Sequence, residues 1–221
     1  MPTRSDTAAR RAPKNPPRTA YRHGDLRRAL IDAGTDLARS GGPDAVVLRE
    51  ATRRAGVVPN AAYRHFASRD ELLDAVRTSA LAGVARAMEA ELAKLGAPRP
   101  SARYARASVR AVGTGYLRYA RAEPGLFRAA FTRPFDPSPP FDPAAAGDSG
   151  LGPFGLLGAA LDRLVAAGVL TTARRAQAEF LAWSAVHGMA MLTIEGPLHG
   201  LPDEPLDALA QRLLDMVERG L

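Results

Sequence analysis

The chain contains no cysteine, only 6% aromatic residues and no long hydrophobic run. The absence of cysteine excludes disulfides, thiolate zinc sites and cysteine nucleophiles, and it fits the cytosol. No apolar run reaches the roughly 18 to 20 residues that cross a bilayer, and no apolar segment follows the basic N-terminus as in a secretory signal. With 221 residues, 46% of them hydrophobic, we expect a cytoplasmic globular protein of one or two domains with no membrane partner.

The sequence also lacks the common catalytic motifs. It contains no H-E-x-x-H, no G-x-S-x-G and no Walker sequence. Gly150, Gly152 and Gly155 satisfy G-x-G-x-x-G, but a loop-like stretch precedes them where a dinucleotide site needs a strand, and Pro153 lacks the amide that a phosphate would use. We therefore expect no enzyme activity, no catalytic residues and no cofactor.

A metal site is also not expected. His187, Glu195 and His199 are the only candidates that the pattern suggests, and Gly196-Pro197 breaks the helix before the last of them.

Positive charge is concentrated in the first third of the chain. Residues 1–69 carry 14 Lys and Arg against 6 Asp and Glu, whereas residues 70–221 carry 16 against 17. The chain is rich in Arg and almost lacks Lys, as proteins from GC-rich genomes often do. That bias explains the choice of Arg but not its uneven distribution, which indicates a separate module for binding DNA phosphates.

Residues 48–73 have the spacing of a helix-turn-helix that continues into a further helix. Gly56 interrupts the apolar pattern, and Pro59, a favoured first helical residue, restarts it. Ser68 and Glu71 then have the spacing in which each side chain caps the other's backbone amide. The apolar helical positions are Leu48, Ala51 and Ala55 before the turn, and Ala62, Tyr63 and Phe66 after it.

The remaining pattern is helical throughout, which predicts an all-α protein of about nine helices. Helices are expected from residue 25 to the Gly41-Gly42 pair, from Arg69 to Leu95, and over 101–122, 124–131, 154–168, 172–195 and 203–220. The helix from Arg69, of about 27 residues, would be roughly 40 Å long.

This arrangement of expected helices predicts two domains and two irregular segments. Residues 22–68 would form a three-helix DNA-binding domain, and 69–221 a helical ligand-binding and dimerisation bundle. The Pro/Gly/Asp-rich residues 133–153 would form a long loop, either a functional lid or disordered.

Residues 1–21 would be a disordered basic arm. Its Arg10, Arg11, Lys14 and Arg18 would contact DNA phosphates or the minor groove, or remain a solvated tail.

Residues 22–76 resemble the TetR family of bacterial transcriptional regulators. The opening RHGDLRRAL resembles one branch of that family, and AWSAVHGMAML matches the W-x-x-x-H-G motif of that branch's C-terminal domain. The residues that carry the resemblance are Gly56, Val57, Tyr63, His65, Phe66, Leu72 and Leu73, and near the end Trp183, His187 and Gly188.

The resemblance implies a set of DNA contacts. The third helix would enter the major groove and the second would assist it; arginine suits guanine and asparagine suits adenine. Val58 and Arg69 depart from the family, which commonly has Ser or Thr and Lys there. Base edges would be met by Pro59, Asn60, Ala61, Arg64 and Arg49, and phosphates by Tyr63, His65 and Arg69.

Some of these residues have an alternative structural role. Tyr63 and Phe66 could both belong to the core of a small domain; we expect this of Phe66 and expect Tyr63 to bind phosphate. His187 could sense a ligand, although packing on Trp183 four residues earlier is the commoner role.

The C-terminal part has aromatic and polarizable residues with few charges along its later helices, which suits an apolar effector pocket. Core packing accounts for many of them. The candidate effector-binding residues are Tyr104, Tyr116, Phe127, Phe131, Trp183, His187 and Met191.

The sequence therefore predicts a DNA-binding transcriptional regulator, and we expect a repressor rather than an activator. It would bind a pseudo-palindromic operator on double-stranded DNA and be released by a small, largely apolar effector. It would act in the cytoplasm, associated with the nucleoid, as a homodimer through residues 172–195 and 203–220. The alternatives are a nonspecific nucleoid protein, or an enzyme or carrier with a basic segment. The apolar residues expected at the dimer interface are Phe180, Met191, Leu206, Leu209, Leu213 and Val217.

Overall fold

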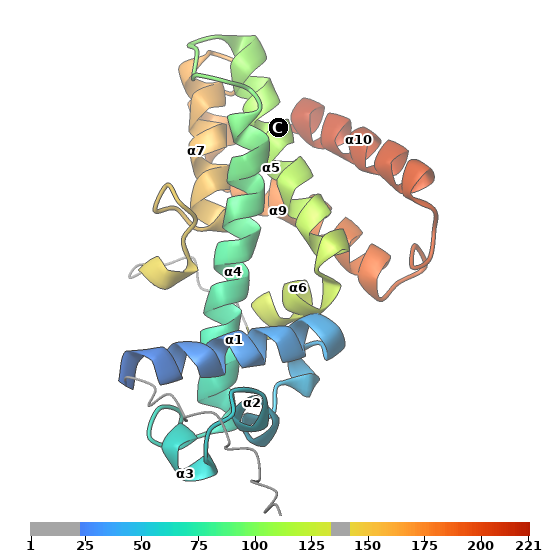
Figure 1. Ribbon diagram of the computed structural model, residues 1–221. Coiled ribbons are helices and arrows are strands. Elements are labelled where there is room, and N and C mark those ends of the chain that lie inside the picture. The colour runs from blue at the N-terminus through green and yellow to red at the C-terminus, as the bar shows by residue number, and fades with distance from the viewer. Residues whose placement is uncertain (1–22, 134–141) are drawn as a thin grey trace, which may run out of the picture.

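A computed structural model of the chain describes residues 23–133 and 142–221 (Figure 1). Every regular element within these ranges is helical, which confirms the prediction of an all-α protein. The basic arm, with Arg10, Arg11, Lys14 and Arg18, lies outside the described residues. The helices are α1 His23–Gly41, α2 Leu48–Arg54, α3 Pro59–Ala62, α4 Arg69–Ala93, α5 Ala102–Ala122, α6 Pro124–Ala130, α7 Pro153–Ala166, α8 Thr172–Arg175, α9 Ala178–Ile194 and α10 Asp203–Gly220, with short 3-10 helices η1 Pro43–Ala45 and η2 Pro143–Ala145.

The first three helices pack at one end of the molecule, around the start of α4 (Figure 1). Their shared core includes Leu30, Val46 and Ala51, all fully buried. Phe66 is 1% exposed in the same core, as the sequence predicted, and the Arg27 guanidinium lies 5.1 Å from the centre of its ring. The helix-turn-helix is therefore held by its own apolar core.

Helix α4 begins where the capping residues predicted. The Ser68 hydroxyl accepts a hydrogen bond from the Glu71 amide at 3.2 Å. The expected reciprocal bond is shifted by one residue, because the Glu71 carboxylate accepts from the Ala67 amide at 2.7 Å. The helix has 25 residues, slightly fewer than expected, which makes it roughly 38 Å long.

The other end of α4 belongs to a larger helical bundle with α5, α7, α9 and α10 (Figure 1). Helix α5 lies close against α4, since a Cβ at Gly115 would be 2.5 Å from both the Ala87 carbonyl oxygen and Met88 Cα. One long helix thus spans both cores.

Helix α6 packs against α1. A Cβ at Gly125 would lie 2.2 Å from the carbonyl oxygen of Ala38, so only glycine permits this approach. Arg39 of α1 also pairs with Glu123, the residue before α6, at 3.0 Å. The N-terminal core consequently contains buried residues from α6 as well as from α1 to α4.

The described part of the expected 133–153 loop is held against α4. Ala145 of η2 is 3% exposed in the N-terminal core. The Glu89 carboxylate accepts hydrogen bonds from the Asp148 and Ser149 amides at 2.8 and 2.9 Å. Burial raises the pKa of Glu89, but these bonds and one from the Ser149 hydroxyl lower it more, so the carboxylate stays charged.

The expected helix over 172–195 is interrupted, which corrects that prediction. Gln177 adopts a left-handed conformation at φ 60° between α8 and α9. The turn places Ala178 fully in the core, while Arg175 before it is anchored to Asp162 at 2.8 Å and to Glu179 at 2.6 Å. No glycine or proline stands at Gln177 or beside it to mark this change of direction in the sequence.

Candidate nucleic-acid interface and effector pocket

Helices α2 and α3 lie at the end of the molecule farthest from the bundle (Figure 1). Arg49 on α2, and Pro59 and Asn60 on α3, are exposed, whereas Ala61 is half-buried. Arg49 and Pro59 line one open groove between the two helices. The sequence-predicted base-reading residues of α2 and of the start of α3 therefore share one surface.

The regular part of the recognition helix is shorter than the sequence suggested. It ends at Ala62, and its first residue follows Val58, which offers no side-chain cap. Hydrogen bonds from the Tyr63 amide to Pro59 O and from the Phe66 amide to Ala62 O continue the winding as turns. Tyr63 and Arg64 are exposed on these turns, and His65 is half-buried.

The arginines of this surface differ in their ion pairing. Glu50 binds Arg53 at 2.7 Å and Arg54 at 3.2 Å, and these hydrogen bonds lower the pKa of Glu50 to about 2. Within residues 23–133 and 142–221, Arg49 and Arg64 take part in no ion pair. Their charges are left for another partner.

Arg69 has a structural role that the sequence did not reveal. Its Nε donates to Val46 O and its Nη2 to Pro43 O, both at 2.9 Å. The guanidinium thus ties the η1 turn to the start of α4. To bind a phosphate, as the resemblance implied, this side chain would have to share or release these bonds.

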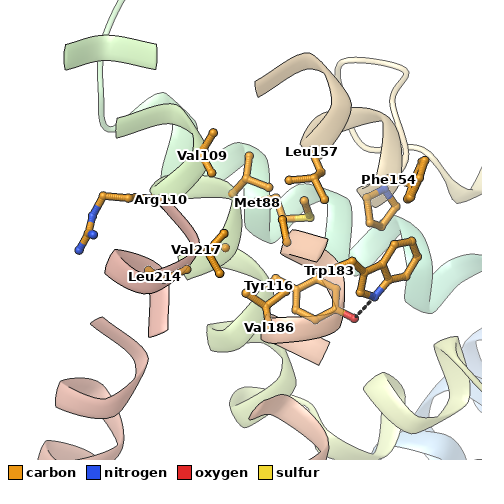
Figure 2. Close-up of a pocket in the computed structure, with 14 residues that line it drawn as sticks. Met88, Val109, Arg110, Tyr116, Phe154, Leu157, Trp183, Val186, Leu214 and Val217 are labelled. Carbon is orange, nitrogen blue, oxygen red and sulfur yellow. Dashed lines mark hydrogen bonds between the residues drawn. The ribbon is translucent and has the colours of Figure 1, made fainter. Parts of the chain in front are cut away.

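A second candidate site is an apolar pocket inside the bundle (Figure 2). Its volume is only about 30 Å³, enough for roughly two water molecules. In Figure 2 Phe154 and Trp183 lie at one end, and Arg110 at the other end points its guanidinium away. The lining residues are Met88, Val109, Arg110, Val112, Gly113, Tyr116, Pro153, Phe154, Leu157, Ala182, Trp183, Val186, Leu214 and Val217.

A hydrogen-bond chain crosses one wall of this pocket. Trp183 Nε1 donates to the Tyr116 hydroxyl at 3.2 Å (Figure 2). The same hydroxyl lies 2.8 Å from His187 Nδ1. Because the tyrosine has one proton, we assign it to the bond with His187, which makes the imidazole neutral with its proton on Nε2. Burial raises the pKa of Tyr116 and lowers that of His187, which keeps both rings uncharged.

The effector residues expected from the sequence fall into three groups. Tyr116 and Trp183 line the pocket. Phe127, Phe131 and His187 lie behind Tyr116, with the His187 ring 5.7 Å from Phe127 and 5.0 Å from Phe131.

The third group departs from the prediction, because Tyr104 and Met191 do not line the pocket. Both are half-buried elsewhere on their helices. Conversely, Met88, Phe154 and Leu214 line the pocket and were missed. They come from three helices far apart in the sequence, and no local pattern brings them together.

The described residues also bear on membrane and metal binding. None of their helices is long and apolar enough to cross a membrane. In this part of the chain, no group of three or more His, Cys, Asp or Glu side chains could hold a metal ion.

Both ends of the chain match known sequence families. Residues 30–76 match the family described as bacterial regulatory proteins, tetR family, and residues 109–217 match the tetracyclin repressor-like C-terminal domain. No curated protein matches the chain.

The fold is also found among solved structures. A protein of unknown function from a Rhodococcus species is 26% identical, with a TM-score of 0.70 over 92% of this chain and 99% of its own. The TetR family transcriptional regulator PfmR from Thermus thermophilus is 20% identical, with a TM-score of 0.54 over 87% of this chain and 98% of its own. The second likeness concerns the fold alone.

Proposed function

Because this chain belongs to the TetR family of DNA-binding transcriptional regulators, we propose that it is a repressor whose homodimer binds a pseudo-palindromic operator and releases it when a small apolar effector binds. The observation that carries this proposal is that α4 extends from one candidate site to the other. Arg69 begins α4 beside the helix-turn-helix, and Met88 of the same helix lines the pocket. The two positions are about 28 Å apart along the helix.

We assign the DNA contacts by chemistry and exposure. Arg49 and Arg64, exposed and without ion pairs in the described part of the chain, would read guanine, and Asn60 would read adenine. Pro59 and Ala61 would lie against base edges, and Tyr63 and His65 would bind phosphates. Arg69 would hold the helix-turn-helix in position and add a phosphate contact.

The dimer would form through an exposed apolar stripe on α9 and α10. Leu181 is 66% exposed, Met216 60% and Leu192 45%, which is unusual for large apolar side chains on ordered helices. Two helices from each protomer would pack as a four-helix bundle and set two recognition helices about 34 to 36 Å apart.

The residues available for this proposed interface differ in part from those expected from the sequence. Leu206 and Val217 were expected to face the partner, but they are buried within the chain's own core. Phe180 at 53% and Leu209 at 38% exposure fit the expected interface. Small Gly188, where an added Cβ would meet no atom within 4 Å, would allow close approach of the two protomers.

The effector would act by opening the pocket. A drug-sized ligand needs about 300 to 1,000 Å³, far more than the present 30 Å³, so its binding must move walls that include α4. Helix α6 offers a second connection, since Phe127 contacts Tyr116 beside the pocket while Gly125 touches α1. Release of DNA follows only if the effector prefers the opened state.

A footprint on DNA flanking the protein's own gene tests the proposal. We expect protection of a pseudo-palindrome, and a loss of about 1 to 3 kcal/mol with relaxed base preference in Arg49→Ala or Arg64→Ala. Arg99→Ala is the matched control. Arg99 is also an exposed arginine, but it lies in the loop between α4 and α5, at the bundle and away from the helix-turn-helix. Equal affinity of the wild type for operator and random duplex at matched salt would instead support a nonspecific nucleoid protein.

A further inference from the structure

A second cavity lies between α5, α9 and α10. Its volume is about 130 Å³, larger than that of the effector pocket. Among the described residues, Leu214 alone lines both cavities, so the two are separate sites with one shared wall. In Figure 1 α10 diverges from α5 on this side of the bundle.

We propose that this cavity binds a small uncharged molecule with a ring-sized apolar body and an amide-like or alcohol-like head. The proposal goes beyond operator binding and does not depend on it.

The floor of the cavity explains the apolar body. Leu117, Met189 and Leu206 are each less than 9% exposed, and Ala120 and Ala190 are 1% exposed beside them. An engineered protein cavity of about 150 Å³ with an apolar lining of Leu, Ile and Phe holds benzene. A floor of this kind therefore has room for one ring but not for a drug-sized molecule.

The rim explains the polar head. Gln211 Oε1 accepts from Arg110 Nη2 at 2.7 Å, which leaves the amide nitrogen of Gln211 as a donor. The Thr193 hydroxyl donates to Met189 O at 2.9 Å, which leaves its oxygen as an acceptor. A head that both donates and accepts matches these two groups.

The charges at the rim explain why the ligand is uncharged. Arg121 is paired with Asp203 and Asp207, and Arg118 with Glu91. A charged ligand would have to break one of these pairs or be desolvated without a partner, and either costs free energy.

The cavity is compatible with the proposed dimer. It is lined by Met189, Ala190 and Thr193 of α9, whereas the exposed apolar stripe contains Leu181 and Leu192 on another face of that helix. A ligand could thus enter without dissociating the protomers.

Titration of the full-length protein with benzamide tests the assignment, with the methyl resonances of Met189 and Leu206 as the readout, since both line this cavity and not the first. We expect saturable shifts with benzamide, and at least about tenfold weaker binding of benzoate and benzylammonium, which have the same ring but opposite charges. Ala210→Leu should abolish binding by filling the cavity, since Ala210 lines it. Ala208→Leu makes the same change at an exposed position of α10 and should leave binding intact.

Thr193→Val serves as a second variant if Ala210→Leu does not fold, and it should weaken benzamide binding several-fold by removing the acceptor. The proposal is overturned if benzamide produces no saturable shifts, if both charged probes bind as tightly as benzamide, or if Ala210→Leu folds and binds benzamide like the wild type. Unchanged affinity in Thr193→Val would also overturn the proposed role of the head group.

Discussion

The Tyr116 hydroxyl lies 2.8 Å from Nδ1 of His187, across one turn of α9 from the Trp183 indole that donates to the same oxygen. The three side chains connect α5 with α9 at the wall of the candidate effector pocket. Because we assign the hydroxyl as the donor to Nδ1, protonation of Nδ1 would break this bond, and the arrangement favours a neutral His187.

Stability should therefore depend on pH through His187. Burial places its folded-state pKa below the ordinary value of 6.5, so the unfolded chain binds a proton first. The stabilisation is present above about pH 6.5 and is lost as the pH falls through that value towards the lower folded pKa. Thermal unfolding between pH 8 and 5 should show a steeper loss in the wild type than in His187→Gln. Parallel curves for the two proteins would contradict this role.

Leu181→Asp should convert the proposed dimer to a monomer. A carboxylate at this 66% exposed position costs little in a monomer but would be buried without a partner in a four-helix interface. Light scattering at micromolar concentration should show the monomer mass, and operator affinity should fall with it. Leu151→Asp, at a 39% exposed position before α7, is the control and should remain dimeric. A monomeric wild type under conditions that preserve DNA binding would exclude the interface.

Arg69→Ala should affect folding and DNA binding together. Loss of the hydrogen bonds to Val46 O and Pro43 O leaves these carbonyls without a charged donor, at a cost of about 1 to 3 kcal/mol in unfolding free energy. Binding should weaken alike for operator and random duplex, because neither bond reads a base. Lysine cannot donate in the same forked geometry, so Arg69→Lys should restore charge but not stability. Full stability in Arg69→Ala, measured by denaturant unfolding, would show that the tether is unimportant.

Gly125→Ala should separate α6 from α1. The new Cβ would overlap the Ala38 carbonyl oxygen, which is backbone and cannot move away alone, so we expect destabilisation of about 1 to 3 kcal/mol. Operator affinity should fall as α1 shifts. Gly158→Ala on α7 is the matched control, since its Cβ would meet only side-chain atoms, the nearest at 3.5 Å. If the two variants unfold at the same temperature, the close approach of α6 has no energetic consequence.

Local signals were sufficient to predict most of the helices and the exposure of most of the residues proposed to contact DNA. Pro59 and the Ser68 cap mark helix starts through bonds within a few residues, and the apolar spacing that buries Phe66 is also local. Long-range geometry was not predictable in this way. The Arg69 tether reaches back 23 and 26 residues. The left-handed residue Gln177 is not a glycine or an asparagine, the residue types that usually signal this conformation.

The lining of the pocket was likewise predictable only where a local signal marked the residue. Tyr116 and Trp183 were identified because aromatic residues are conspicuous in a chain that has few. Met88 and Leu214 have the ordinary apolar spacing of buried helical positions, and only the packing of α4 and α10 makes them pocket residues.

The coupling between pocket and operator can be measured directly, because Trp183 is the only tryptophan and lines the pocket. An apolar compound that quenches its fluorescence would be titrated into free protein and into operator-bound protein, and operator affinity would be measured with and without the compound. Thermodynamic linkage requires the compound to bind operator-bound protein more weakly, by the same factor by which it weakens operator binding. Equal affinity of the compound for the free and the DNA-bound protein would contradict effector-driven release, even if the pocket itself binds ligand.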